Sequence, residues 1–156
     1  MNREILFKAK RKDNGEWGEG YYIYHIKRTI CPFGDSVKPE DEQHVIMQDG
    51  FSDWNMPRDT VVYEIDPDTL CQYTGLTDKN GNEIWENDII SIAAYSYDEP
   101  EDDYFGIVTY CEKDACWSLN NNEKYGEIIC ECFGSYTTEI INHGNIFDNP
   151  ELLEVE

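Results

Sequence analysis

The chain lacks any long hydrophobic run. No stretch of its 156 residues approaches the roughly 20 consecutive apolar residues that a bilayer-spanning helix needs. The first ten residues, MNREILFKAK, are charged within three positions and contain no apolar segment of the signal-peptide kind. The sequence therefore predicts a cytoplasmic protein with neither a membrane anchor nor a membrane partner.

Basic residues are scarce. The chain has 33 acids and 12 bases, which gives a net charge of −21. Residues 1–66 carry 13 acids and 9 bases, whereas residues 67–156 carry 20 acids and 3 bases. A surface so poor in cations cannot replace the counterions of a phosphate backbone, so we predict no direct nucleic-acid binding. The imbalance favours a basic protein partner, a bound cation, or a face that serves only solubility.

Enzyme motifs are also missing. The chain has three histidines, His25, His44 and His143, and none stands in an H-E-x-x-H zinc motif. It has no G-x-S-x-G nucleophile motif and no glycine-rich phosphate loop followed by lysine. We therefore predict that the protein is not an enzyme, and we assign no catalytic residue, no metal ligand and no cofactor.

Six cysteines are present, but their spacing fits a zinc site poorly. Zinc-binding cysteines of one pair are usually about two to four residues apart. Here four residues separate Cys111 from Cys116, and one separates Cys130 from Cys132. Because nothing directs secretion, reduced thiols are favoured over disulfides. We interpret the cysteines as small buried apolar side chains, with a four-thiolate zinc site as the less favoured alternative.

What the chain does contain is material for β-strands. Apolar residues make up 40% of it and aromatic residues 13%, enough to bury a core. From Ile5 to Lys12 the residues alternate between two faces, which predicts a half-buried strand. Asn14-Gly15 is a hairpin-turn signal, and the aromatic run 21–26 is the expected partner strand.

The segment 31–59 is rich in proline, glycine and aspartate. This composition predicts a long loop that holds one short strand near 45–47. Residues 60–65 are expected to form another strand, and Asp66-Pro67-Asp68 breaks it. We place a domain boundary there, between a β-rich N-terminal part, 1–66, and a second domain, 67–156.

The second domain is predicted to consist of short strands separated by turns. The expected strands are 72–75, 89–93, 105–111, 115–119, 127–133 and 143–147, with a closing helical turn at Pro150. Strands at this spacing predict a small barrel. The expected fold class is mainly β, with only short helical turns.

Three blocks of the chain resemble the YopX family. They are REILFKAKRKDNGEW, CQYTGLTDKNGNEIWENDII and GNIFDNPELLE, and together they extend over essentially the whole chain. The resemblance implies a phage or prophage protein of a bacterial host cell, with a C-terminal SH3-like barrel after a β-rich N-terminal part. It implies no activity, because the family is uncharacterised. The family usually has Gly-Asp where this chain has Asn87-Asp88, and Asn accepts the same left-handed backbone.

The candidate partner-binding segment is an acidic run in the second domain. Five acids occupy the six positions from Asp98 to Asp103, which we predict to be a loop. The predicted site comprises Tyr97, Asp98, Glu99, Glu101, Asp102, Asp103 and Tyr104. Divalent-cation binding is an alternative, but the run lacks the D-x-D-x-D-G order of a calcium loop. A solvated loop without a ligand is the plainer alternative.

Aromatic residues offer a second means of binding. Tyr21, Tyr22 and Tyr24 alternate across the predicted strand 21–26, so at least one is expected to face outward. SH3-like barrels bind extended peptides on aromatic faces, and acids beside such a face would favour peptides rich in lysine and arginine. The alternative is that these rings belong to the core.

The function that the sequence favours is that of an acidic protein-binding module acting on a basic phage or host protein. A sharper version is DNA mimicry, in which carboxylates occupy a nucleic-acid-binding groove of the partner. The alternative is a structural or assembly protein that acts as a homo-oligomer, because small β units leave strand edges ready for pairing.

Overall fold

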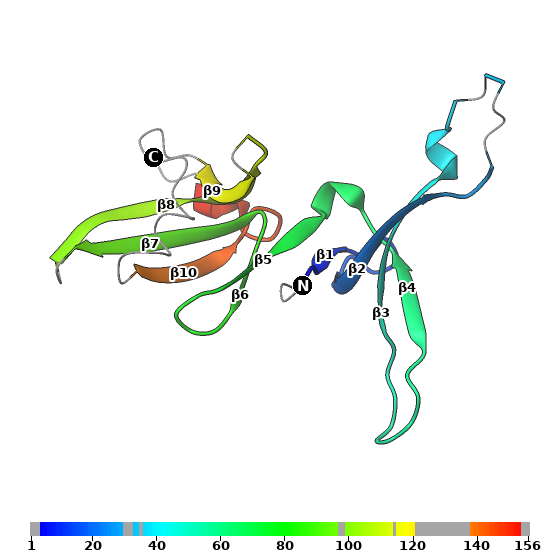
Figure 1. Cartoon of the computed structure of the whole chain (residues 1–156), viewed down its shortest axis with the longest axis horizontal. Helices are drawn as coiled ribbons and strands as arrows, with labels where there is room; N and C mark the ends of the chain where they lie inside the picture. The colour runs from blue at the N-terminus through cyan, green and yellow to red at the C-terminus, as the bar shows by residue number, and fades with distance from the viewer. Residues whose placement is uncertain are drawn as a thin grey trace. The chain divides into compact units, whose positions relative to one another are not determined.

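A computed structural model describes residues 4–29, 33–34, 36–96, 99–113, 115–120 and 138–153. These residues form ten β-strands and three short 3-10 helices (Figure 1). The chain divides into two compact units, 1–72 and 73–156. The mainly β fold class is therefore confirmed, and within the described residues no helix is long and apolar enough to cross a membrane.

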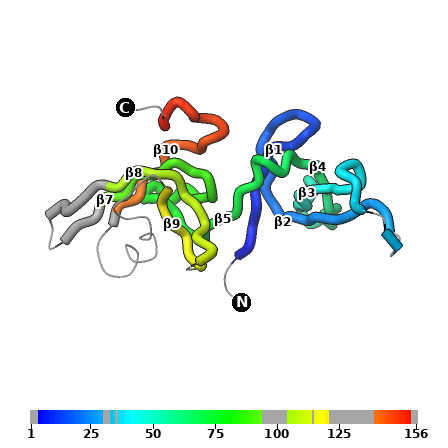
Figure 2. Tube along the Cα trace, turned by 90° about the horizontal axis from the view of Figure 1, so that it is seen from above, coloured from blue at the N-terminus to red at the C-terminus, as the bar shows by residue number. Residues whose placement is uncertain are grey.

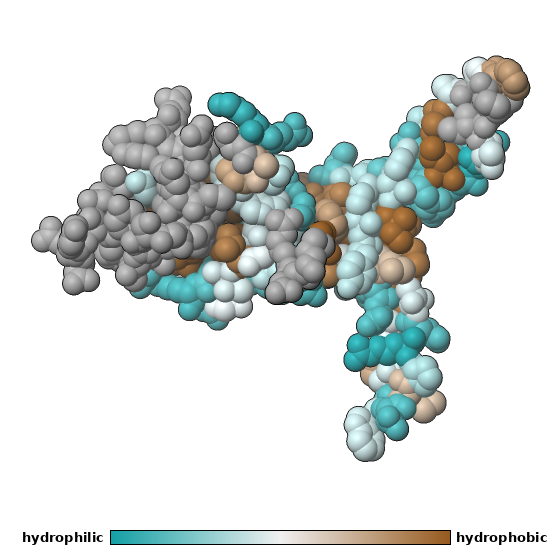
Figure 3. Space-filling model, viewed as in Figure 1, coloured by the Kyte–Doolittle hydropathy of each residue, from teal (hydrophilic) through white to brown (hydrophobic). Residues whose placement is uncertain are grey.

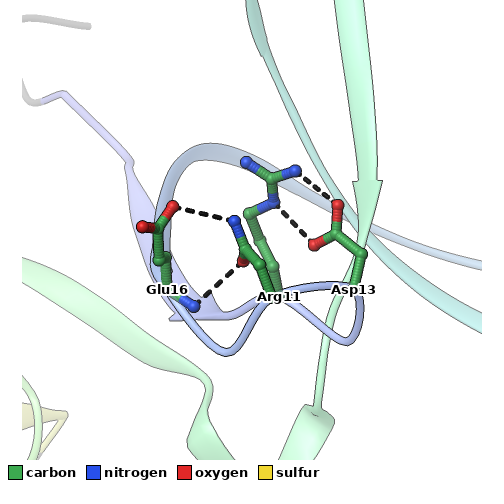
Figure 4. A network of polar contacts seen from close by, with 4 residues as sticks. Arg11, Asp13 and Glu16 are labelled. Atoms are coloured by element: carbon green, nitrogen blue, oxygen red, sulfur yellow. Dashed lines mark hydrogen bonds and ion pairs between the residues drawn. The ribbon is translucent and has the colours of Figure 1, made fainter.

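The predicted N-terminal hairpin is confirmed. Strands β1 (Phe7–Lys10) and β2 (Trp17–Ile26) pair antiparallel, with Lys10 opposite Trp17. Gly15 has a φ of 73°, the left-handed conformation that the turn signal required. The turn is held by Arg11, whose Nε donates to Asp13 at 3.0 Å and whose backbone N–H donates to the Glu16 carbonyl at 2.9 Å (Figure 4).

The segment predicted as a long loop, 31–59, contains a longer strand than expected. Strand β3 runs from Glu42 to Asp49, after the 3-10 helix η1 (Pro39–Asp41). It is longer because it is paired on both sides: Met47 lies opposite Tyr21 of β2 and opposite Val62 of β4 (Thr60–Glu64). Hydrogen bonds from two neighbours extend a strand beyond its apolar centre, including over the polar residues at its ends.

The core of the first unit lies on one face of these strands. Ala9, Ile46 and Ile65 are fully buried. An antiparallel bridge between Arg11 and Ile65 links the chain after β1 to the chain after β4. The predicted strand break at Asp66 is the start of the 3-10 helix η2 (Pro67–Thr69), where the Asp66 side chain accepts from the backbone N–H of Asp68.

Strand β5 (Cys71–Thr77) contributes to both units. Cys71 and Gln72 pair with β1, and the later residues pair with β6 (Glu83–Trp85). The hydrogen-bonded order in the first unit is therefore β4-β3-β2-β1-β5. The boundary predicted at residues 66–68 lies shortly before the division between Gln72 and Tyr73.

The second unit contains a four-stranded antiparallel sheet in the order β10-β7-β8-β9 (Figure 2). Its strands are β7 (Asp88–Ser96), β8 (Glu99–Cys111), β9 (Cys116–Asn120) and β10 (Thr138–Asn145). Strand β10 begins and ends earlier than the expected 143–147, because its pairing with β7 starts at Thr138. The expected strand 127–133 lies outside the described residues.

A separate core holds the second sheet together. Ile84, Ile90, Ile92, Val108 and Ile140 are almost completely buried, and Trp117 and Leu119 join them. Each such side chain contributes roughly 1.5–3 kcal/mol of burial free energy. The chain then closes with the 3-10 helix η3 (Pro150–Leu153), as the helical-turn prediction required. Across the described residues the ladder β10-β7-β8-β9 is open, so the SH3-like barrel stays a prediction.

Candidate functional site

The predicted acidic loop is not a loop where the structure describes it. The backbone from Glu99 to Asp103 belongs to β8 and pairs with β7, with Glu99 opposite Ser96 and Asp103 opposite Ala93. Pairing with the long strand β7, although its register shifts between Ala94 and Tyr95, overrides the weak strand preference of acidic residues. Tyr97 and Asp98 lie outside the described residues.

Tyr104, the last residue of the predicted site, packs inward. Its side chain is half-buried against the core of the second unit. The predicted binding segment is therefore placed as an acidic strand segment, Glu99–Asp103, followed by a tyrosine that serves the core.

The charge of the second unit cannot be neutralised from within it. Residues 73–156 contain 19 acids and 3 bases, a net charge of −16. One of the three bases, Lys79, is paired with Glu139 at 3.2 Å. Because acids outnumber bases so strongly, most carboxylates of this unit have no lysine or arginine of the same unit to pair with. The unit is surrounded by a negative potential that attracts cations and basic proteins.

Two buried aspartates of the second unit serve the fold instead. Asp88 is 2% exposed and accepts hydrogen bonds from the Trp85 N–H at 2.9 Å and from the Asn142 side chain at 2.7 Å. The preceding residue, Asn87, has a φ of 66°, which confirms that Asn takes the left-handed conformation here. These contacts give the Asn87-Asp88 step a structural role.

Asp78 organises the tight turn before β6. Its carboxylate accepts hydrogen bonds from the backbone N–H groups of Asn80 and Asn82, each at 2.8 Å, and from the Asn82 side chain at 2.9 Å. Burial raises the pKa of this carboxyl group, but the hydrogen bonds lower it more, so the pKa lies below the ordinary value of 3.8. Asp78 is therefore ionised at neutral pH and holds the turn.

Two of the histidines form hydrogen bonds with hydroxyl groups. His44 Nδ1 lies 2.7 Å from the Tyr22 hydroxyl, and burial raises the pKa of Tyr22 above 10.0. His143 Nε2 lies 2.8 Å from the Ser91 hydroxyl on the surface of the second sheet. A serine nucleophile needs a histidine that is oriented by a third group, and no carboxylate of the described residues is bonded to His143. The Ser91–His143 contact is thus a surface hydrogen bond.

No group of three or more metal-binding side chains occurs among the described residues. Cys111 and Cys116 lie opposite each other in the pairing of β8 with β9. Cys130 and Cys132, the other half of the alternative zinc site, lie outside the described part of the chain. Cys71 is fully buried and its thiol donates to the Thr69 carbonyl, which fits the prediction of a small buried side chain, whereas Cys111 and Cys116 are only half-buried.

The loop between β3 and β4 is a feature that the sequence reasoning missed. This segment, Gly50–Asp59, is called the aromatic loop below, and Figure 1 shows it running well beyond the ends of both strands. Phe51 is 93% exposed, Trp54 97% and Met56 63%. Exposed apolar surface of this kind, where several such side chains share one loop, marks a candidate interaction site. The available signal was phenylalanine and tryptophan within a stretch otherwise typical of a loop.

The outer face of the first sheet is apolar as well. Tyr21 and Val62 are each 54% exposed and Ile23 is 38% exposed, and Tyr21 and Val62 both flank Met47. The prediction that at least one tyrosine of strand 21–26 faces outward is therefore confirmed. Figure 3 shows hydrophobic surface interspersed with hydrophilic surface on this unit. The first unit thus presents apolar groups and the second unit presents negative charge.

Comparison with protein families agrees with the resemblance that the three sequence blocks carry. A comparison with curated proteins gave no match. The crystal structure of protein EF1440 from Enterococcus faecalis is similar, with 23% sequence identity, coverage of 98% of this chain and 100% of that chain, and a TM-score of 0.49. The model of the family described as YopX protein matches residues 6–154. The chain therefore belongs to the YopX family.

Proposed function

We propose that this protein is a non-enzymatic, acidic binding module of a phage or prophage, and that it acts on a basic phage or host protein. The single observation that carries the proposal is the charge of the second unit, where 19 acids face 3 bases. Carboxylates without internal counter-charges attract a cationic partner over a long distance and raise the association rate.

The acidic strand segment Glu99–Asp103 is the proposed centre of that contact, together with Asp98. It is the densest acidic run of the chain, and its backbone is held by pairing with β7. A run of acids along one strand supports the sharper version of the proposal, mimicry of a nucleic-acid backbone. The SH3-like barrel implied for this unit is part of the same proposal.

The test is affinity capture from bacterial host lysate at low and moderate salt, with a charge variant and a matched control. The variant is Asp98→Asn/Glu101→Gln/Asp103→Asn, and the control neutralises three exposed acids of the first unit, Glu4, Glu40 and Asp68. We expect one basic protein to be captured at low salt, and about ten-fold weaker capture by the variant than by the control. Equal capture by variant and control would contradict the proposed site.

A second candidate function is self-assembly as a structural homo-oligomer. The observation that favours it is the outward apolar face of Tyr21, Ile23 and Val62 on the first sheet. Opposing it, each copy carries a charge of −21, so two copies repel one another at low salt. Light scattering at micromolar concentration tests this candidate, and a strict monomer at moderate salt would rule it out.

A further inference from the structure

The aromatic loop is unusual because its large aromatic side chains lie almost wholly in water. Phe51 and Trp54 are 93% and 97% exposed. The chain's other tryptophans that lie in strands of the second unit, Trp85 and Trp117, are only 5% and 8% exposed. Exposed loops are ordinarily polar, and burying an aromatic ring at an interface removes 150–250 Å² or so from water. Burial of these rings against a partner would therefore contribute a large favourable free energy of binding.

The loop is also held in shape before any partner arrives. At its base the Gly50 N–H donates to the Asp59 carbonyl at 2.7 Å, and Arg58 pairs with Asp49 at 3.2 Å. A side chain at Gly50 would meet the Asp59 carbonyl oxygen at 2.8 Å, so the base closes tightly only with glycine. Because the two ends are fixed, less conformational entropy is lost on binding.

A second constraint lies at the tip. The Met56 N–H donates to the Asp53 carbonyl at 3.1 Å, and Asn55 has a φ of 65°. These features define a tight turn that holds Trp54 at its corner. The turn makes the side chain protrude, and it explains why Trp54 finds no packing partner within its own loop.

We infer that the aromatic loop is the apolar anchor of the interface, which inserts Phe51 and Trp54 into an apolar pocket with a basic rim on the partner protein. The inference rests on the proposed function and deepens it by naming the surface that supplies affinity. Tryptophan is enriched among the few residues that dominate binding free energy. The acids of the second unit would then act on the association rate, and the loop on the lifetime of the complex.

Charge decides between a basic protein and the other surfaces that could receive the loop. Asp53 lies between Phe51 and Trp54, and among the described residues no lysine or arginine pairs with it. A second copy of the chain also carries −21, so two copies repel one another at low salt. An anionic membrane surface repels a chain of this charge for the same reason. A basic protein satisfies both the apolar rings and the carboxylate between them.

The experiment compares the loss of exposed aromatic rings from two different connections of the first unit. Phe51→Ala/Trp54→Ala removes the proposed anchor, whereas Phe33→Ala removes an equally exposed ring, 94% exposed, from the connection between β2 and β3. Both variants are first checked for unchanged thermal unfolding. Affinity for the partner protein captured in the charge test is then measured at low and moderate salt.

We expect the double variant to bind about 30-fold or more weakly at both salt concentrations, mainly through faster dissociation, with little change for Phe33→Ala. Equal affinities of the double variant and the Phe33→Ala control would overturn the inference while leaving the proposed function intact. If the unmodified protein captures no partner at any salt concentration, the proposed function fails and the inference fails with it.

A photo-crosslinking residue placed at position 54, and at position 33 as the control, identifies what receives the loop. Crosslinks from position 54 to the same basic protein support the inference. Crosslinks to a second copy of the chain overturn it. Binding of the protein to vesicles of anionic phospholipid that is lost in the double variant overturns it too, in favour of a membrane surface.

Discussion

The two units of this protein differ in what they show to the solvent. Residues 1–72 carry 14 acids and 9 bases, a net charge of −5, and they expose phenylalanine, tryptophan, tyrosine and valine. Residues 73–156 carry −16, and their described large side chains are mostly gathered in one core. Under the proposed function, the charge of the second unit would attract a basic partner and the apolar groups of the first unit would hold it.

The largest effect on stability is expected from shortening one core side chain in each unit. Ile46→Ala in the first unit and Ile90→Ala in the second each delete a fully buried side chain. We expect each to lower the free energy of unfolding by about 2–5 kcal/mol, because a cavity remains. Hydrogen exchange, measured separately for residues 1–72 and 73–156, should show loss of protection confined to the altered unit.

If either isoleucine variant loosened both units equally, the two would form one cooperative structure. A matched control is Val62→Ala, which deletes methyl groups from an exposed position of the first sheet and should change the unfolding free energy by less than about 0.5 kcal/mol.

A smaller effect is expected from Asp88, the buried carboxylate at the entry to β7. Asp88→Ala leaves the Trp85 N–H and the Asn142 amide without their acceptor. The cost is about 1–3 kcal/mol, since a buried donor loses its partner. Urea denaturation measures it, with Glu83→Ala at an exposed position of the neighbouring strand as the control. A loss of stability no greater than that of Glu83→Ala would show that the Asp88 carboxylate has no structural role.

The pH dependence of stability tests the role of Asp78, a carboxylate of the second unit that is hydrogen-bonded within the fold. Its folded pKa lies below 3.8, so its stabilising contribution is complete above the ordinary pKa and is lost as pH falls through the folded value. We expect Asp78→Asn to destabilise the protein at pH 7 and to match the unaltered chain near pH 2. Denaturation at both pH values checks this.

For Asp78 the matched control is Glu139→Gln, at an exposed carboxylate paired with Lys79 on the surface. Its effect on stability should be small at either pH, because exposed ion pairs contribute little. An equal loss from Asp78→Asn at both pH values would mean that the turn does not depend on the charge of the carboxylate.

The smallest effect on stability is expected from the variant that should weaken binding most. Phe51→Ala/Trp54→Ala removes side chains that are almost wholly in water, so the unfolding free energy should change by no more than about 0.5 kcal/mol. Thermal denaturation checks this. A loss above 1 kcal/mol or so would mean that the rings support the fold and would weaken the contrast between the two units.

Local signals in the sequence predicted the features that depend on neighbouring residues. The hairpin around Asn14-Gly15 and the helical turn at Pro150 were found where expected, because turn residues act through their own backbone preferences. The left-handed conformation at Asn87 followed from the same preferences. Composition likewise established the charge imbalance, which does not depend on the fold at all.

Features that depend on distant residues were predicted less well. Strand β3 was predicted only as a short strand near 45–47 within a long loop, and Glu99–Asp103 was predicted as a loop, because the pairing partners that order them come from other parts of the chain. The exposure of Phe51 and Trp54 could not be foreseen either, since apolar residues normally indicate a core.

The sequence by itself thus determined the mainly β class, the family, the sites of the tight turns and the sign and location of the charge. The tertiary structure decided which strands extend, which tyrosines face outward and which aromatic rings remain in solvent. The physical reason is that turn geometry and charge belong to individual residues, whereas strand length and burial are set by neighbours that only folding brings together.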